Sequence, residues 1–471
     1  MYHILNIGSE SLFANRQGID TTAHNIANAQ TEGYSRQRVE ITQRKPLDRH
    51  GIIIGNGVYV GNIQRSHNRL LEKQLNMAQT DKGDSETRLE TLQKIGSIFS
   101  PEIDRNISAA LQKFFSAWQD LSKYPEEVTV RTQLKEQAEN LADTFQSVDS
   151  DLKEQRHAIN EEIHQTVDKI TNRVQSIAHL NKQIREMEVG VSNESNDLRD
   201  QRDRNLRELS EMIDIHYYVD KDGMTTVHGP GGTLLVERGH GATLEVTKNP
   251  QNHGLYDIQV LGFEKRSMRE VTHHISGGKL NALLRVRDQS LAGVLSKVNH
   301  MADTLITQMN QIHRQGYGIG DYRGLNQVDF FKPLAPELDA AQNIQLSDAI
   351  VGSTDAIAAG SVPHSVGDNV IANQVIRLQE DRLFYDGKAT LDQYYGDMVG
   401  NLGLETVRIG QLKEADAIIY ADLQAKRESV SGVSLDEEAS NLIRWQTAFT
   451  ASSKVITTVD EMFETVLGLK R

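Results

Sequence analysis

Three aspartates at regular spacing form the part of this 471-residue chain that is best suited to chemistry. Asp197, Asp200 and Asp203 lie in the run NDLRDQRDR, where a helix would place them on one side. Carboxylate oxygens arranged in this way could hold a hard cation such as Ca²⁺. Arg204 and Arg207 each follow one of the aspartates by four residues, which favours ion pairs within a helix. Because neutralised carboxylates are poor cation ligands, we interpret the run as structural ion pairing.

Two other patterns could bind a phosphate or a metal, but each lacks part of what such a site needs. Gly55-Asn56-Gly57 is not followed by a helix that begins with Lys-Ser or Lys-Thr, as a P-loop is. His273-His274 is expected on a strand, where adjacent side chains point to opposite faces and cannot reach one metal. The chain has no cysteine, which excludes disulfides and thiol catalysis. We expect no catalytic residue, no metal and no other cofactor, and therefore no enzyme.

The composition limits the classes of partner. The net charge is -14, and Lys and Arg form no block of the kind that neutralises phosphates, so a nucleic-acid partner is not expected. The chain has no run of about 18 apolar residues and no basic, apolar leader, so it is expected to be soluble, without membrane insertion or a general secretory signal. The lack of cysteine fits a cytosolic protein or an exported subunit, and composition alone does not choose between them.

The helices that must position these residues are most regular at the two ends of the chain. Between Gly432 and Leu469 the apolar residues repeat every seven positions, with three more in the intervening positions: Leu435, Leu442, Phe449, Ile456 and Phe463, with Trp445, Val459 and Val466. Near the N-terminus the same period joins Leu5, Leu12, Ile19 and Ile26. A heptad period is typical of a coiled-coil seam, and amphipathic helices gain most of their stability from packing. We predict that the two terminal helices pair along these stripes and form the assembly interface.

The middle of the chain is predicted to be helical, with one β-rich insert. Residues 68–213 are almost continuously helical, with loop signals at Ser100-Pro101, Tyr124-Pro125 and 190–193. The Asn56-Gly57 pair predicts a hairpin between Ile52–Ile54 and Val58–Val60. After Ile215 short β runs alternate with Asp-Gly and Gly-Pro turns, and the last predicted strand is 271–275.

These patterns predict a mainly α fold with a small antiparallel β insert. Three parts are expected. The first is a coiled-coil-like terminal helical stalk of residues 1–45 and 430–471. The second is an elongated helical bundle domain of residues 46–214 and 276–429 that carries the small hairpin and the loops. The third is a short β-rich insert domain of residues 215–275.

Two motifs, one near each end, resemble those of a known family. The run ANAQTEGYSRQ at 27–37 follows a helix that ends in His24-Asn25-Ile26, and it resembles the signature of the flagellar rod, hook and hook-associated axial family. The run SGVSLDEEA at 431–439 resembles the closing motif of the same family and points to the hook-associated branch that forms the first hook-filament junction. The matching positions are Asn25, Asn28, Thr31, Gly33, Tyr34, Arg36, Gly432, Glu437 and Glu438.

The first motif also has a simple physical reading. Gly33 can adopt the left-handed conformation that closes a helix, and Asn25 and Asn28 can bond to backbone groups that a helix end leaves unpaired. On this reading the residues end a helix and do no chemistry.

The resemblance implies a structural adaptor that joins hook to filament through its paired terminal helices. It further implies a ring of identical subunits, neighbours in the hook protein and the second hook-filament junction protein, and a dedicated chaperone. Export through the flagellar type III apparatus to the extracellular flagellum is implied as well. The alternatives are another axial subunit, such as the hook protein, or an unrelated secreted helical adhesin or scaffold. A deletion strain that exports flagellin without attaching filaments would separate these alternatives.

Overall fold

The structure is a computed structural model, and its described residues are mainly helical. It describes residues 2–49, 52–100, 106–189, 194–263, 268–335, 337–365 and 367–468. The predicted loop signals at Pro101 and 190–193 lie outside these residues. The small sheets are all antiparallel, so the predicted fold class is confirmed. Within the described ranges, none of the helices is both long and apolar enough to span a bilayer.

The chain divides into two compact units. Unit 1 comprises Met1–Asp84, Gln165–Leu280 and Glu414–Arg471, and unit 2 comprises Ser85–His164 and Asn281–Lys413. This division places the insert of residues 215–275 in the same unit as both termini, whereas the sequence suggests a domain of its own. The three-part division stays a prediction.

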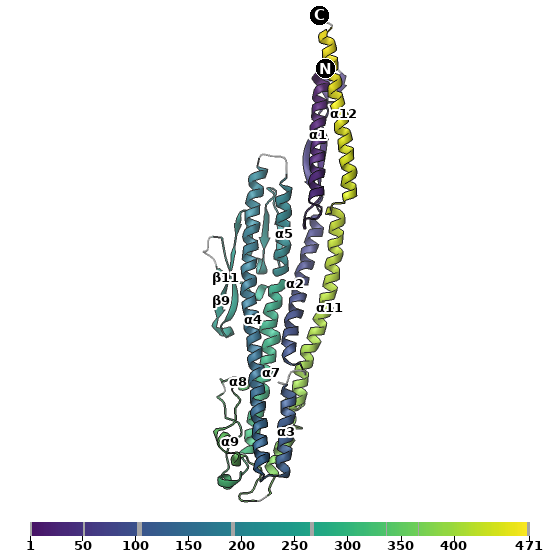
Figure 1. The fold of residues 1–471 in the computed structure, drawn as a ribbon. Coiled ribbons are helices and arrows are strands. Elements are labelled where there is room, and N and C mark those ends of the chain that lie inside the picture. Colours follow the sequence, from purple (N-terminus) through teal and green to yellow (C-terminus); the bar gives the residue numbers. More distant parts are fainter. Residues whose placement is uncertain are drawn as a thin grey trace. The chain divides into compact units, whose positions relative to one another are not determined.

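The predicted helices are present, and Figure 1 labels most of them. Their bounds are α1 Tyr2–Ala27, α2 Arg69–Ile98, α3 Ile107–Lys123, α4 Val128–Glu188, α5 Asn196–Met212, α6 Gly278–Arg285, α7 Leu291–His313, α8 Ala340–Asn343, α9 Asp348–Gly352, α10 Val370–Leu378, α11 Leu391–Ser431 and α12 Leu435–Gly468. The apolar stripe of α4 from Ile163 to Ile184 is buried, as the three-and-four spacing predicts.

Unit 2 is built around an aromatic core. Phe114 and Trp118 on α3 are fully buried, and their rings lie 6.0 and 5.5 Å from that of Phe330. Phe331 completes the cluster at 6.3 Å from Phe114. Edge-to-face and tilted pairs at these distances are favourable because the ring edges are positive and the faces negative. The aromatic residues of α3 are therefore core, as expected, and not a cofactor pocket.

The predicted hairpin around Asn56-Gly57 is wrong. Strand β3 (Ile52–Ile54) pairs with the preceding strand β2 (Leu47–Arg49) and not with the following strand. Strand β4 (Val58–Arg65) pairs with β1 (Gln37–Gln43). Gly57 has a φ of +76°, so it does make a turn, but the turn leads from one ladder into the other. The β1–β4 ladder joins seven residue pairs, which provides more hydrogen bonds than a three-residue hairpin could.

The insert contains two small antiparallel sheets. One has the strand order β5-β6-β7-β8 and the other β11-β10-β9. Their bounds are β5 His216–Val219, β6 Thr225–His228, β7 Leu234–Glu237, β8 His240–Gly241, β9 Thr243–Asn249, β10 Leu255–Leu261 and β11 Met268–Glu270.

The predicted strand at 271–275 is wrong. The last strand ends at Glu270, and Thr272–His274 form a 3-10 turn. The Thr272 hydroxyl accepts a hydrogen bond from the Ile258 amide at 2.9 Å, in the place of a ladder partner. A side-chain bond of this kind competes with strand pairing.

Candidate assembly site at the paired terminal helices

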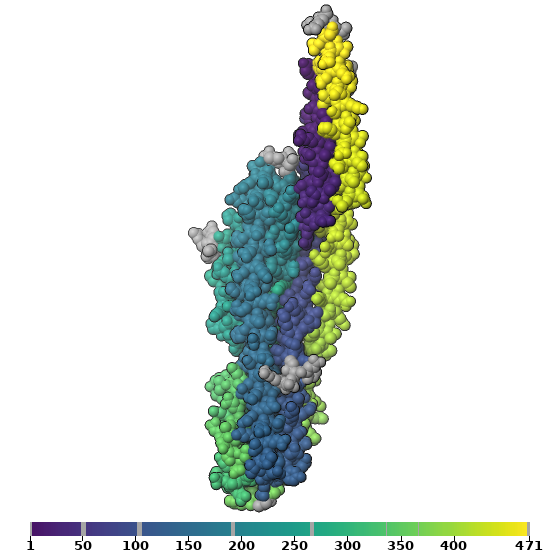
Figure 2. All heavy atoms as spheres, in the orientation of Figure 1, coloured from purple at the N-terminus to yellow at the C-terminus, as the bar shows by residue number. Residues whose placement is uncertain are grey.

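The two terminal helices pack side by side and run antiparallel, as the two heptad repeats predict. Figure 1 shows α1 and α12 in contact, and Figure 2 shows their purple and yellow surfaces against each other. The rings of Tyr2 and Phe463 lie 5.5 Å apart, while Asn25 donates to the Glu438 carboxylate at 3.0 Å. The start of α1 therefore meets the end of α12, and the end of α1 meets the start of α12.

The α1 side of this seam consists of small and polar residues. Ser11 Oγ lies 2.8 Å from Ser452 Oγ, and Asn15 donates to the same hydroxyl at 3.1 Å. A Cβ on Gly18 would lie 2.5 Å from the Trp445 ring, so only glycine allows this approach. The residues on this face follow a heptad period: Gly8, Ser11, Asn15, Gly18, Thr22 and Asn25.

The predicted apolar stripe of α1 is not the seam. Leu5, Leu12, Ile19 and Ile26 are all half-buried, whereas the fully buried residues of the helix are Gly8, Ala14, Asn15, Gly18, Thr21, Thr22 and Asn25. Small residues face α12 because they let the two backbones come close. The apolar stripe consequently runs along the flank of the pair.

On α12 the predicted residues divide between the seam and its flanks. Val459 is buried at 3% exposure. Four others are half-buried: Leu442, Trp445, Ile456 and Phe463. Leu435 and Phe449 are exposed at 53% and 36%. The heptad repeat thus covers both the seam and its flanks, and the role of these residues in assembly stays a prediction.

The turn after α1 depends on Gly33 and on two polar side chains. Asn28 donates to the His24 carbonyl at 3.0 Å, and Thr31 donates to the Asn28 side chain at 3.2 Å. Gly33 has a φ of +81°, and Arg427 donates to its carbonyl at 3.1 Å. Asn28 therefore bonds a carbonyl of the last turn of α1, as predicted, whereas Gly33 shapes the turn six residues after the helix ends at Ala27, and Asn25 bonds the backbone of Gln37 in β1.

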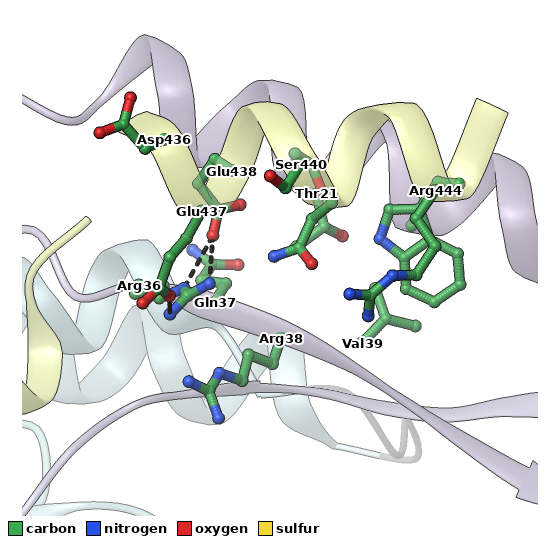
Figure 3. A pocket seen from close by; sticks show the side chains of 14 residues that line it. Thr21, Arg36, Gln37, Arg38, Val39, Asp436, Glu437, Glu438, Ser440 and Arg444 are labelled. Carbon is green, nitrogen blue, oxygen red and sulfur yellow. Dashed lines mark hydrogen bonds and ion pairs between the residues drawn. The ribbon is translucent and has the colours of Figure 1, made fainter. Parts of the chain in front are cut away.

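Arg36 joins the two sequence motifs in a buried polar cluster. Its guanidinium lies 2.6 Å from a carboxylate oxygen of Glu438 and 2.6 Å from one of Glu437 (Figure 3). Arg36 and Glu438 are only 8% and 2% exposed. Asn25 donates to the second oxygen of Glu438 and accepts from the Tyr34 hydroxyl at 2.8 Å. We name these five residues the Arg36 cluster.

The surroundings of the Arg36 cluster keep the Tyr34 hydroxyl protonated. Burial raises the pKa of Tyr34, and the carboxylates of Asp197, Asp200 and Glu438 raise it further, so the hydroxyl remains a donor. Gly432 begins the link into α12, where a Cβ would collide with the carbonyl oxygen of Glu428.

The aspartate run of α5 is a structural ion-pair site, but its partner is not the predicted one. Asp200 and Asp203 bind Arg65 of β4 at 2.6 and 2.7 Å, and not Arg204 or Arg207. Arg204 instead donates to a backbone carbonyl in the turn after α1. The correction follows from tertiary contacts, because one buried guanidinium can serve both carboxylates at once.

The two aspartates respond differently to this environment. Burial raises the pKa of Asp200, although Arg65 opposes the shift. Burial acts in the same direction on Asp203, but Arg65 and Arg202 together lower its pKa. Asp197 lies apart and accepts from the Gln37 side chain at 2.8 Å. The part of the chain that the structure describes contains no cluster of three or more His, Asp or Glu side chains fit to hold a metal.

Sequence reasoning missed three features of this site. The small-residue seam of α1 could have been found, since Gly8, Asn15 and Thr22 repeat every seven residues. The role of Arg65 could not, because 135 positions separate it from Asp200. The pairing of Glu72 with Arg427 at 2.7 Å could not be predicted either, because 355 positions separate the two residues.

The paired termini and their two motifs define a flagellar axial protein. Residues 425–469 match the family described as the flagellar basal body rod FlgEFG protein C-terminal domain. Residues 92–331, just over half of the chain, match the family described as the flagellar hook-associated protein FlgK helical domain. The chain belongs to the FlgK family of flagellar hook-associated proteins.

Curated relatives match over the full length. The chain is 26% identical to the flagellar hook-associated protein 1 of Bacillus subtilis strain 168, with 98% of this chain and 97% of the relative covered. It is 24% identical to that of Salmonella typhimurium strain LT2, with both chains covered completely. A solved structure of the flagellar hook junction protein FlgK from Burkholderia pseudomallei shows the same fold, with a TM-score of 0.66 at 15% identity over 76% of this chain and all of that one. The predicted resemblance is confirmed.

Proposed function

We propose that this chain is a structural junction subunit of the bacterial flagellum, which joins hook to filament and assembles through α1 and α12. The FlgK family supplies the class of protein. The observation that carries the assembly role is the apolar surface that the paired helices leave exposed. No catalytic role belongs to this proposal.

The exposed apolar residues lie along both terminal helices. On α12 they are Leu435, Ile443, Phe449, Val455, Met462, Val466 and Leu467, with exposures from 36% to 67%. On α1, Tyr2, Ile4 and Phe13 are 77%, 43% and 61% exposed. Exposed apolar side chains along both helices of the pair support a contact with another protein. Neighbouring copies in a ring would bury it.

The remaining assignments follow from this role. Residues 1–45 and 430–471 act as the assembly stalk, 46–214 and 276–429 as the helical body, and 215–275 as the β insert. The partners are identical subunits, the hook protein and the second hook-filament junction protein. An export chaperone and the flagellar type III apparatus deliver the chain to the extracellular flagellum.

The test is Phe449→Asp. Because Phe449 is 36% exposed, the folded subunit tolerates a polar side chain at this position. In a junction, however, the same carboxylate would be buried against a neighbour without a partner, which is costly. We expect cells with this variant to secrete flagellin into the medium and to retain few filaments, while unit 2 melts as before.

The matched control is Val351→Asp, which places the same charge at an exposed apolar position of unit 2, 52% exposed. It should leave filament attachment unchanged. Normal attachment with Phe449→Asp, or early melting of unit 2 in that variant, would show that the exposed stripe is not an assembly surface.

A further inference from the structure

One edge of the four-stranded sheet in unit 1 lacks a partner strand. The strand order is β5-β6-β7-β8, so β5 pairs with β6 on one side alone. An unpaired strand edge presents a row of backbone donors and acceptors, which makes it a template for another strand. The edge belongs to the insert of residues 215–275 and not to the terminal helices.

The register shows which backbone groups of β5 are free. At the turn between β5 and β6, the Asp220 amide donates to the Met224 carbonyl at 2.9 Å. Hydrogen-bonded pairs alternate along an antiparallel ladder, so the backbone of Tyr218 also points to β6. The backbone groups of Tyr217 and Val219 point to the opposite side, where none of the described residues bonds to them. These two residues offer their amide donors and carbonyl acceptors to an added strand.

Two open hollows of about 350 Å³ each lie along this edge. Residues 215–217 line the first, which we name the Ile215 hollow, and residues 217–219 line the second, the Val219 hollow. Lys73 of α2 lines both. Because successive side chains of a strand point to opposite faces, three successive residues in one lining show that each hollow meets the edge of the strand. An added strand would therefore occupy the two hollows.

The rims of the hollows carry exposed apolar side chains and unpaired positive charge. Leu70 and Met77 of α2 are both 68% exposed, and Tyr218 is 54% exposed. Arg69 and Lys73 lie one turn apart at the start of α2, where both are exposed and neither forms an ion pair with a described residue. Each of these five residues lines at least one of the hollows. The edge therefore suits a segment that is both apolar and acidic.

The carboxylates in the linings indicate where the acidic part of such a segment belongs. Asp203 lines the Val219 hollow together with Arg69, but Arg65 already binds it at 2.7 Å. The Ile215 hollow contains Asp81 and Asp214, so it repels a further carboxylate. Acidic side chains should therefore lie in the Val219 hollow, and apolar side chains in the Ile215 hollow.

A second copy of this chain offers no acidic strand for this edge among its described strands. The strands with a free edge are β1, β2, β3, β4, β5, β8, β9 and β11, and in none of them do acidic side chains outnumber basic ones. The complementary segment must come from a different protein.

We propose that the outer edge of β5 binds an extended, acidic segment of a different protein, which joins the sheet as a further strand. Backbone hydrogen bonds to Tyr217 and Val219 provide the affinity, and Arg69 and Lys73 select carboxylates. The inference goes beyond the proposed junction function and does not depend on it.

A hexapeptide of alternating glutamate and valine, added to the purified full chain, is the probe. At saturation it should slow hydrogen exchange of the Tyr217 and Val219 amides at least about tenfold, because both become paired. The Tyr218 amide already faces β6 and should change less than about twofold. A peptide of alternating lysine and valine should bind about tenfold more weakly. The glutamate peptide methylated at every backbone nitrogen should not bind, because it has no amide hydrogen to donate.

Two pairs of variants separate the backbone from the charge. Val219→Pro removes an amide hydrogen that the sheet does not use and should abolish binding, while Val219→Ala keeps that hydrogen and should bind within about threefold of the unchanged chain. Lys73→Glu should weaken binding of the glutamate peptide about tenfold and strengthen that of the lysine peptide. Lys169→Glu, at an exposed position of α4, is the matched control and should change neither.

Three outcomes would overturn the proposal. The first is unchanged exchange at Tyr217 and Val219 with millimolar glutamate peptide, and the second is equal protection by the lysine peptide or the methylated peptide. The third is self-association of the free chain that Val219→Pro abolishes, which would assign the edge to a second copy. If Val219→Pro does not fold, the methylated peptide still decides the matter on the unchanged chain.

Discussion

Removing Glu438 should separate the ends of α1 and α12 that the Arg36 cluster holds together. Glu438 is 2% exposed, and its two oxygens bind the Arg36 guanidinium and the Asn25 amide at 2.6 to 3.0 Å. Glu438→Ala leaves Arg36 buried with one remaining partner, the exposed carboxylate of Glu437.

The size of the effect follows from burial. Breaking a buried ion pair by removing one partner costs roughly 3–5 kcal/mol, because the other charge stays uncompensated. Since Glu437 still neutralises part of the guanidinium, we expect the lower end of that range, about 3 kcal/mol. Glu437→Ala removes a partner whose side chain is 62% exposed, and it should cost less than about 1 kcal/mol.

Amide hydrogen exchange of the free subunit measures this loss where it occurs. In Glu438→Ala the amides at the end of α1 and the start of α12 should exchange about a hundredfold faster, whereas unit 2 should keep its protection. Arg36→Met with Glu438→Leu should recover much of the protection, because an apolar pair replaces the buried charges. Equal effects of Glu437→Ala and Glu438→Ala would refute the assignment of Arg36 to a buried pair.

Three further predictions concern other parts of the structure. Gly18→Ala should weaken terminal pairing by about 1–3 kcal/mol, because the new methyl group meets the rigid Trp445 ring; proteolysis of α12 measures it. Burial lowers the pKa of His313 to about 4, and the Ala358 amide donates to its ring at 2.8 Å. Protection of this amide from hydrogen exchange should be complete above pH 6.5 and decline towards pH 4. The free energy of opening should fall by about 3 kcal/mol in total. Calorimetric titration with Ca²⁺, Zn²⁺ or ATP should be flat, since Arg65 already neutralises Asp200 and Asp203 and Asp197 lies apart from them.

Each of these predictions has its own control. Gly8→Ala should be milder than the change at Gly18, because its Cβ would lie 3.0 Å from a flexible isoleucine. His313→Asn should flatten the pH profile between pH 6.5 and 4, and an unchanged slope would assign the acid response to another group. Micromolar binding of any of the three ligands would contradict the ion-pair reading of the aspartates.

Local patterns predicted the elements of this fold well, whereas partners distant in the sequence could not be predicted. Periodicity located α1, α4 and α12 because the spacing of apolar residues depends only on helix geometry. It could not show that β3 pairs with β2 and β4 with β1, since two hairpins compete for the same residues.

The candidate site shows the same limit more sharply. The motifs indicated Arg36 and Glu438 separately, and nothing in the sequence predicted that their side chains meet. Their contact joins positions 402 residues apart, and no local propensity encodes it. The aspartates of α5 were assigned to ion pairs correctly, yet Arg65 replaced the expected helical partners because a buried guanidinium satisfies two carboxylates better than exposed side chains can.

On the proposed function, the small and polar face of α1 gives a physical reason for pairing and assembly to use different residues. This face of glycine, serine and asparagine adds little apolar area of its own to the contact with Trp445 and Val459 of α12, while its hydrogen bonds, such as Asn15 to Ser452, specify one register. An apolar face on α1 would pair more tightly but would bury the side chains that the proposed contacts with neighbouring subunits require. With the apolar stripe of α1 on the flank, the register is fixed in the single subunit, and on the proposed function this stripe becomes buried when copies meet. The terminal helices should therefore be the least protected part of the free chain and among the most protected parts of the assembled one.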